Sequence, residues 1–142
     1  MKISTRGQYA LEAALCLAAN RGSRLSTREI SERTGISAGY LEQLFIPLKR
    51  DGVLDGARGP RGGYLLARDP EKISAGDVLR SAEQNVAVVP CVKGEGLCAK
   101  EGDCIAQRTW VELDRAIAAR IDSVSLADLA RAFDARYNGA VP

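Results

Sequence analysis

Three cysteines stand close together in the second half of the chain, Cys91, Cys98 and Cys104, in the spacing C-x6-C-x5-C. Cysteine thiolates are soft ligands that suit iron, iron–sulfur clusters or zinc. The 142-residue sequence contains no histidine, which removes the commonest general base and excludes Ser-His-Asp and Cys-His catalysis. These residue types favour a metal or thiol site over the active site of an enzyme.

Charge is divided unevenly along the chain. Residues 1–70 hold 11 Lys or Arg against 7 Asp or Glu, and residues 71–142 hold 9 against 11. This difference fits a basic, nucleic-acid-binding head on a mildly acidic body. No apolar run reaches the roughly 18 residues of a membrane span, and the N-terminus lacks a signal-peptide core with a cleavage site. We therefore expect a cytoplasmic protein with no membrane partner, whose clustered cysteines bind metal, sense redox state or pack in a core.

Residues 26–50 carry the signals of two short helices. Ser26 and Glu29 form a capping-box pattern, Thr34-Gly35 ends the first helix, and Ser37 caps the second. Two helices separated by a short glycine-containing turn predict a helix-turn-helix. The second helix would then present its first residues to the major groove of DNA. These residues are Ser37, Ala38, Gly39, Tyr40, Glu42 and Gln43. The other interpretation is a solvated helix face.

Two of these side chains suit particular bases. Gln43 can pair with adenine, and Glu42 can accept a hydrogen bond from the N4 amino group of cytosine. A carboxylate is unusual in a surface that meets phosphates, so Glu42 is best explained as a base reader or as a filter against wrong bases.

The segment from Val53 to Leu66 contains two short strand-like pieces around a tip of Gly, Pro and Arg, and it predicts a β-hairpin. At such a tip, Arg58 and Arg61 fit the narrow minor groove of DNA or a pair of phosphates. A glycine-rich loop can also hold a nucleotide, but this spacing matches neither the P-loop nor the dinucleotide fingerprint.

The two ends of the chain supply helices for packing. Residues 5–20 are apolar on several faces, so we expect a buried helix in which Cys16 is a core residue. Lys2, Ser4 and Arg6 before or in its first turn either touch phosphate or form a solvated terminus. A later apolar stripe predicts a helix of about five turns that packs within the chain or forms a dimer interface. Its members are Ala106, Trp110, Leu113, Ile117, Ile121 and Val124.

Four features together carry a resemblance that covers nearly the whole chain. They are the opening KISTRGQYAL, the segment ISERTGISAGYLEQLF, the hairpin RGPRGGYLL and the three-cysteine loop before a Trp-bearing helix. In these features the chain resembles the Rrf-type winged-helix regulators of bacteria. The resemblance implies a mainly α fold with a small β-hairpin wing. It further implies a winged helix-turn-helix head over residues 1–82, a cysteine-bearing loop over 83–104, and a dimerisation helix with a C-terminal helix over 105–142.

The resemblance also implies a function. A homodimer would bind double-stranded DNA at a palindrome-like operator, with Tyr40, Glu42 and Gln43 in the reading part of the helix and Arg58 in the wing. An iron–sulfur cluster on the cysteine loop, 2Fe–2S in preference to 4Fe–4S, would control that binding. Arg61 is a departure, because family members have glycine at this point, and its charge would raise non-specific affinity.

The cysteine loop departs from the pattern of the cluster-binding members. Their spacing is C-x5-C-x5-C with a histidine three residues later, whereas the first gap here is one residue longer and Gln107 takes the place of the histidine. For the fourth ligand the candidates are Glu12 from the partner subunit, Asp103 and Gln107, besides an exogenous thiol or water. Zinc and a metal-free thiol switch stay open. The alternative function is a cluster-free repressor controlled by a partner protein or by thiol oxidation.

Overall fold

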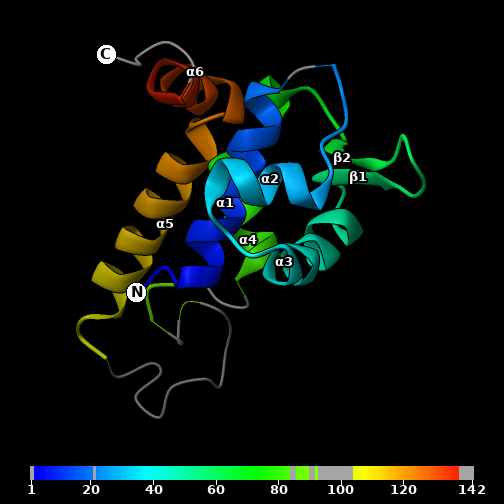
Figure 1. Cartoon of the computed structure of the whole chain (residues 1–142). Coiled ribbons are helices and arrows are strands. Elements are labelled where there is room, and N and C mark those ends of the chain that lie inside the picture. The colour runs from blue at the N-terminus through cyan, green and yellow to red at the C-terminus, as the bar shows by residue number, and fades with distance from the viewer. Residues whose placement is uncertain (1, 21, 84–85, 90–91, 93–103, 138–142) are drawn as a thin grey trace.

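The computed structural model describes residues 2–20, 22–83, 86–89, 92 and 104–137 of the chain. Over these residues the fold is mainly α-helical with one β-hairpin (Figure 1), as the sequence predicts. The elements in chain order are α1 (Thr5–Ala19), α2 (Thr27–Thr34), α3 (Ala38–Arg50), β1 (Leu54–Ala57), β2 (Gly63–Leu66), the short 3-10 helix η1 (Pro70–Lys72), α4 (Ala75–Ala82), α5 (Gln107–Ser123) and α6 (Leu126–Tyr137).

Local capping sets the limits of the helices that the sequence predicts. In the capping box of α2, the Ser26 hydroxyl accepts from the Glu29 amide, and the Glu29 carboxylate accepts from the Ser26 amide at 2.7 Å. Gly35 ends α2 with a φ of 77°, a left-handed conformation that glycine adopts without strain. Ser74 and Asp77 cap α4 in the same reciprocal way. The predicted helix-turn-helix boundaries are therefore confirmed.

Helix α1 lies at the centre of the fold, with α6 and α4 packed along it and α2, α3 and β2 also in contact. Its buried side chains are mostly small, which lets several neighbours approach its backbone. The prediction of a buried first helix is confirmed, and Cys16 is a core residue with 1% of its surface exposed. The largest fully buried side chains around α1 are Phe45, Ile30, Leu41, Leu44, Leu48, Ile73, Leu126, Val53 and Val78.

The hairpin β1–β2, which we call the wing, is antiparallel and pairs Leu54 with Leu66 and Ala57 with Gly63. Leu25, in the segment before α2, forms an additional antiparallel bridge with Tyr64. The ring of Tyr64 packs on Phe45 of α3 with the ring centroids 4.5 Å apart. The base of the wing is thus joined both to the segment before α2 and to the core face of α3.

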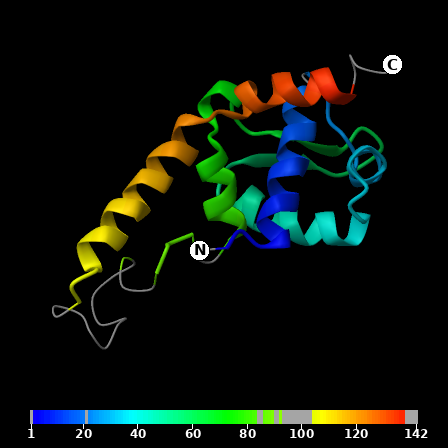
Figure 2. The same ribbon diagram turned by 90° about the vertical axis from the view of Figure 1, so that its left-hand side faces the viewer.

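Helix α5 extends away from the rest of the molecule, and α6 returns over α1 (Figure 2). None of the residues of α5 is buried, and Leu113 is 42% exposed. Two backbone hydrogen bonds of 2.8 Å, from Ala75 to Val124 and from Leu126 to Ile73, fix the junction of α5 and α6 to the start of α4. Within the described residues, no helix has the length and apolar character needed to cross a membrane.

Candidate nucleic-acid interface and thiol site

The first turns of α3 form an exposed surface. The Ser37 hydroxyl caps the helix by accepting a hydrogen bond from the Tyr40 amide at 3.3 Å. The opposite side of α3 is held in the core, which turns the remaining positions outward. The exposed positions are Ser37, Ala38, Gly39, Tyr40, Glu42 and Gln43, together with Ile46. Six predicted DNA-binding residues therefore share one accessible surface at the start of α3.

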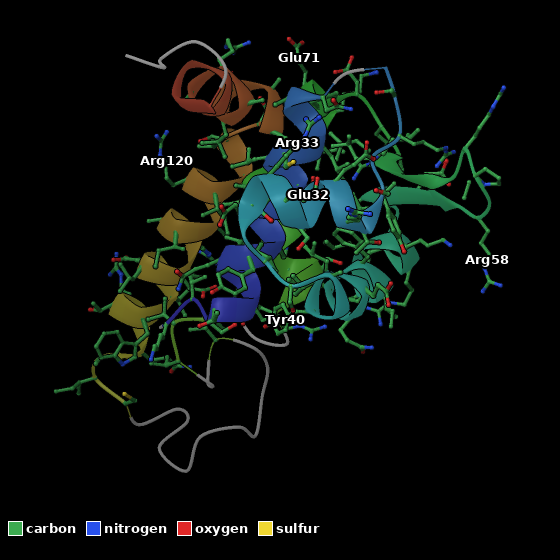
Figure 3. All side chains as sticks on the ribbon, in the orientation of Figure 1. Glu32, Arg33, Tyr40, Arg58, Glu71 and Arg120 are labelled. Atoms are coloured by element: carbon green, nitrogen blue, oxygen red, sulfur yellow. The ribbon has the colours of Figure 1, made fainter. Side chains whose placement is uncertain are left out.

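The wing carries its arginines at an exposed tip. Arg58 and Arg61 lie in the connection between β1 and β2, and Figure 3 shows Arg58 extending away from the body of the protein. In the part of the chain that the structure describes, neither guanidinium forms an ion pair. Both charges are therefore available to a polyanion.

The end of α3 is different, because its positive charge is already paired. Arg50 donates two hydrogen bonds to the carboxylate of Asp51, at 3.0 and 3.2 Å, and the Ser81 hydroxyl donates a third at 2.8 Å. The bonds from Arg50, and then the bond from Ser81, lower the pKa of Asp51. The basic groups free to meet DNA thus lie at the wing tip.

The N-terminal residues predicted to touch phosphate are held by contacts within the chain. The Ser4 amide and hydroxyl both donate to one carboxylate oxygen of Glu83, at 2.8 and 2.7 Å, while the same hydroxyl caps α1. Nε of Arg6 donates to the Ala82 carbonyl at 2.9 Å, and Lys2 is exposed. Ser4 thus joins the start of α1 to the end of α4, and phosphate contacts by these residues stay a prediction.

One aromatic contact connects α1 to this surface and has no signal in the sequence. The rings of Tyr9 and Tyr40 meet edge to face, with centroids 5.7 Å apart and planes at 86°. The two residues lie in different helices 31 positions apart, and neither spacing nor periodicity pairs them.

The predicted thiol site is described only in part. Cys104 is half-buried with a free thiol, and its carbonyl accepts from the amide of Gln107, the first residue of α5, at 3.2 Å. Glu12 is half-buried on α1. Cys91, Cys98 and Asp103 lie outside the described residues. Among the described residues no group of three Cys, Asp or Glu side chains could hold a metal ion.

The donor chemistry can still be tested against an iron–sulfur cluster. Three thiolates fit iron, which such clusters bind mainly through cysteine. The fourth donor does not follow from the described residues, since the Gln107 amide is a poor ligand for iron. Cys16 is separate from this set, because burial raises the pKa of its thiol and so disfavours the thiolate that binds metal.

A helix-turn-helix with an exposed second helix, flanked by a hairpin with free arginines at its tip, defines a winged-helix protein of the DNA-binding class. The particular family follows from comparison with known proteins. The model of the Rrf2 family of iron-dependent transcriptional regulators matches residues 3–132. The chain belongs to the Rrf2 family of transcriptional regulators.

Three relatives illustrate the range of the match. The chain is 35% identical to the regulator IscR of Escherichia coli over 130 residues, which cover 91% of this chain and 80% of that protein. Among solved structures it is similar to CymR, the global cysteine regulator of B. subtilis, with a TM-score of 0.79, 34% identity and coverage of 93% and 98%. T. potens IscR gives a TM-score of 0.75, 34% identity and coverage of 94% and 88%.

These relatives are transcriptional regulators, so the prediction that the chain is not an enzyme is confirmed. The predicted winged-helix fold is confirmed by the same structural matches.

Proposed function

We propose that this chain acts as a homodimer that binds palindromic double-stranded DNA, and that an iron–sulfur cluster on its cysteine loop controls the binding. One observation carries the DNA-binding part. The exposed start of α3 lies in the same head as a wing whose two tip arginines are exposed and unpaired within the described residues.

Each part of this surface has its own chemistry. Gln43 can form a bidentate pair with adenine, whereas the Glu42 carboxylate can accept from cytosine and is repelled by phosphates. Arg58 and Arg61 suit the negative potential of the minor groove. Base choice is thus assigned to α3, and most of the charge-driven affinity to the wing.

The dimer is supported by helix α5. Its apolar stripe has no buried member, Leu113 is 42% exposed, and Ile105 just before the helix is fully exposed. Exposed apolar side chains on a projecting helix favour association with a second helix, and paired heads match the two half-sites of a palindrome.

The control site is assigned to Cys91, Cys98 and Cys104. Three thiols in 14 residues suit iron, and IscR proteins are among the relatives. Glu12 of the partner subunit, Asp103 and Gln107 are the candidate fourth ligands, in that order. When bound, a 2Fe–2S cluster would supply redox chemistry that responds to oxidants. The chain's own part is to hold the cluster by its thiolates next to the start of α5.

A second candidate function has support of its own. The chain is similar to CymR, and Gln107 is a poor iron ligand. In this version the protein is a cluster-free repressor, and oxidation of the same cysteines or a partner protein controls DNA binding.

One experiment tests both versions. The protein is purified without oxygen, its iron, sulfide and absorption spectrum are measured, and binding sites are selected from a random duplex pool and footprinted. The cluster version expects a brown protein with comparable iron and sulfide and with DNA affinity that changes when the cluster is removed. A colourless protein without iron after anaerobic reconstitution would refute the cluster version, and failure to select any DNA would refute both.

A further inference from the structure

A single arginine outside the wing spans both of its strands. Nη2 of Arg24, in the segment before α2, lies 2.9 Å from a carboxylate oxygen of Asp55 on β1. Nη1 of the same guanidinium lies 3.3 Å from the Gly63 carbonyl on β2. The Arg24 side chain is only 26% exposed, so it lies along the protein rather than in solvent.

The backbone around this contact is tightly held. Leu25 and Tyr64 exchange two hydrogen bonds, of 2.9 and 2.7 Å, and Leu25 is 3% exposed. Gly63 has a φ of 121°, and a Cβ atom there would collide with the backbone of Leu25, so only glycine permits this approach. The segment 24–25 therefore adds a short third strand to the base of the wing and ties it to the start of α2.

The tip of the wing has no such support. Arg58, Gly59, Pro60 and Arg61 are all exposed. Arg58 lies three residues beyond Asp55, which is about 10 Å along a strand, so a tilt of about 10° at the base moves the tip by about 2 Å. The direction in which the tip arginines extend thus depends on the contacts at the base.

We propose that Arg24 is a positioning residue for DNA recognition: its ion pair with Asp55 and its hydrogen bond to Gly63 set the angle at which the wing presents Arg58 to the minor groove. This inference rests on the proposed DNA binding. The ordinary interpretation of such a residue is an arginine that contacts phosphate directly, and the two interpretations predict opposite effects for Asp55.

The distinction comes from the sign of the charge change. Asp55→Ala removes a negative charge near a polyanion and releases Arg24. If Arg24 contacts phosphate directly, DNA binding becomes tighter. If Arg24 acts by positioning the wing, DNA binding becomes weaker, because the tip arginine loses its fixed direction.

A double-mutant cycle measures the positioning directly. The dissociation constants of Arg58→Ala, Arg24→Ala, Asp55→Ala and the two double variants with Arg58→Ala are measured by fluorescence anisotropy at one salt concentration. The DNA is a duplex selected by the wild type from a random pool. We expect Arg58→Ala to weaken binding about tenfold in the wild type, the loss of one charge-assisted contact, and less than about twofold when Arg24 or Asp55 is also replaced.

The matched control is Arg28→Ala. Arg28 is an exposed residue of α2 that pairs with Glu32 at 3.1 Å, so its replacement makes the same charge change away from the wing base. In that background Arg58→Ala is expected to keep its full tenfold effect. Urea unfolding midpoints identify any variant that fails to fold, and Arg24→Lys, which keeps the charge but cannot span both strands, then replaces Arg24→Ala.

Two results would overturn the inference: an equal Arg58→Ala effect in every background, or tighter binding by Asp55→Ala. A wild-type protein that selects no DNA would instead overturn the proposed function, and the inference with it.

Discussion

Tyr9 of α1 and Tyr40 of α3 meet edge to face with their ring centroids 5.7 Å apart, and both rings are about one-third exposed. Tyr40 lies among the predicted base-reading residues, whereas Tyr9 belongs to the central helix. The contact gives the exposed end of α3 a support outside its own helix. It also means that a displacement of α1 would alter the surface presented to DNA.

The first prediction concerns this pair. Tyr9→Ala removes an aromatic contact of about 0.5–1.5 kcal/mol and leaves Tyr40 free to rotate, so we expect preference for selected over random DNA to fall about two- to tenfold. Tyr9→Phe keeps the ring and should behave as the wild type. Competition binding with both DNAs measures the preference, and an equal loss in both variants would contradict a role for the ring.

The second prediction separates affinity from base choice. Arg58→Ala should weaken binding to selected and random DNA alike and reduce the salt slope by about 1, because one phosphate-type contact is lost. Gln43→Ala should mainly relax the preferred sequence, with a cost of about 1–3 kcal/mol at one base pair. Salt titrations on both DNAs provide the measurement. Identical losses in the two variants would refute this division.

The third prediction concerns the thiols. Serine at Cys91, Cys98 or Cys104 should abolish the bound iron and sulfide of anaerobically prepared protein, because each is assigned as a ligand. Cys16→Ala is the matched control, since this thiol is buried in the core and should leave the iron content unchanged. Iron retained in all three serine variants would exclude the assigned site.

The fourth prediction tests the contact between Ser4 and Glu83. A Cβ atom on Gly7 would collide with the Glu83 carboxylate, so Gly7→Ala must displace that side chain from Ser4. We expect a loss of about 1–3 kcal/mol in the free energy of unfolding, as for other overpacked sites. Gly39→Ala is the control, because Gly39 has open space around it, and alanine in a helix should leave stability unchanged or raise it by up to about 1 kcal/mol. Urea unfolding compares the two.

The fifth prediction concerns pH. The Ser26 amide and hydroxyl hold the pKa of Glu29 below its ordinary value. The folded state thus favours the carboxylate, and this stabilisation is present above the unfolded pKa and lost as pH falls through the folded one. The melting temperature of the wild type should therefore fall more steeply between about pH 6 and pH 3 than that of Glu29→Gln. Parallel curves would refute the role of the carboxylate.

The sequence predicts the local features of this fold well. The capping pairs Ser26–Glu29 and Ser74–Asp77 and the turn at Gly35 are signals that lie within a few residues, and the structure has each of them where it was expected. The apolar character of residues 5–20 likewise predicts the buried central helix. Local hydrogen bonds and periodicity carry these predictions, so they need no knowledge of the tertiary fold.

The contacts that join elements could not be predicted in this way. Ser4 and Glu83 are 79 positions apart, and nothing in their surroundings pairs them. Arg24 and Asp55 are ordinary charged residues until the wing folds back on the segment before α2. The assignments of Lys2, Ser4 and Arg6 to phosphate also left out competition from the end of α4. The domain limits and the cluster ligands stay predictions.

The backbone hydrogen bonds that join Ile73 and Ala75 to Val124 and Leu126 give the fold a modular character. Glu83 fixes the other end of the intervening segment to Ser4, so the chain leaves the head and returns to it at two anchored points. Everything between these points can change in length or chemistry while the reading head keeps its core. One DNA-binding scaffold could in this way acquire different sensors by insertion rather than by redesign.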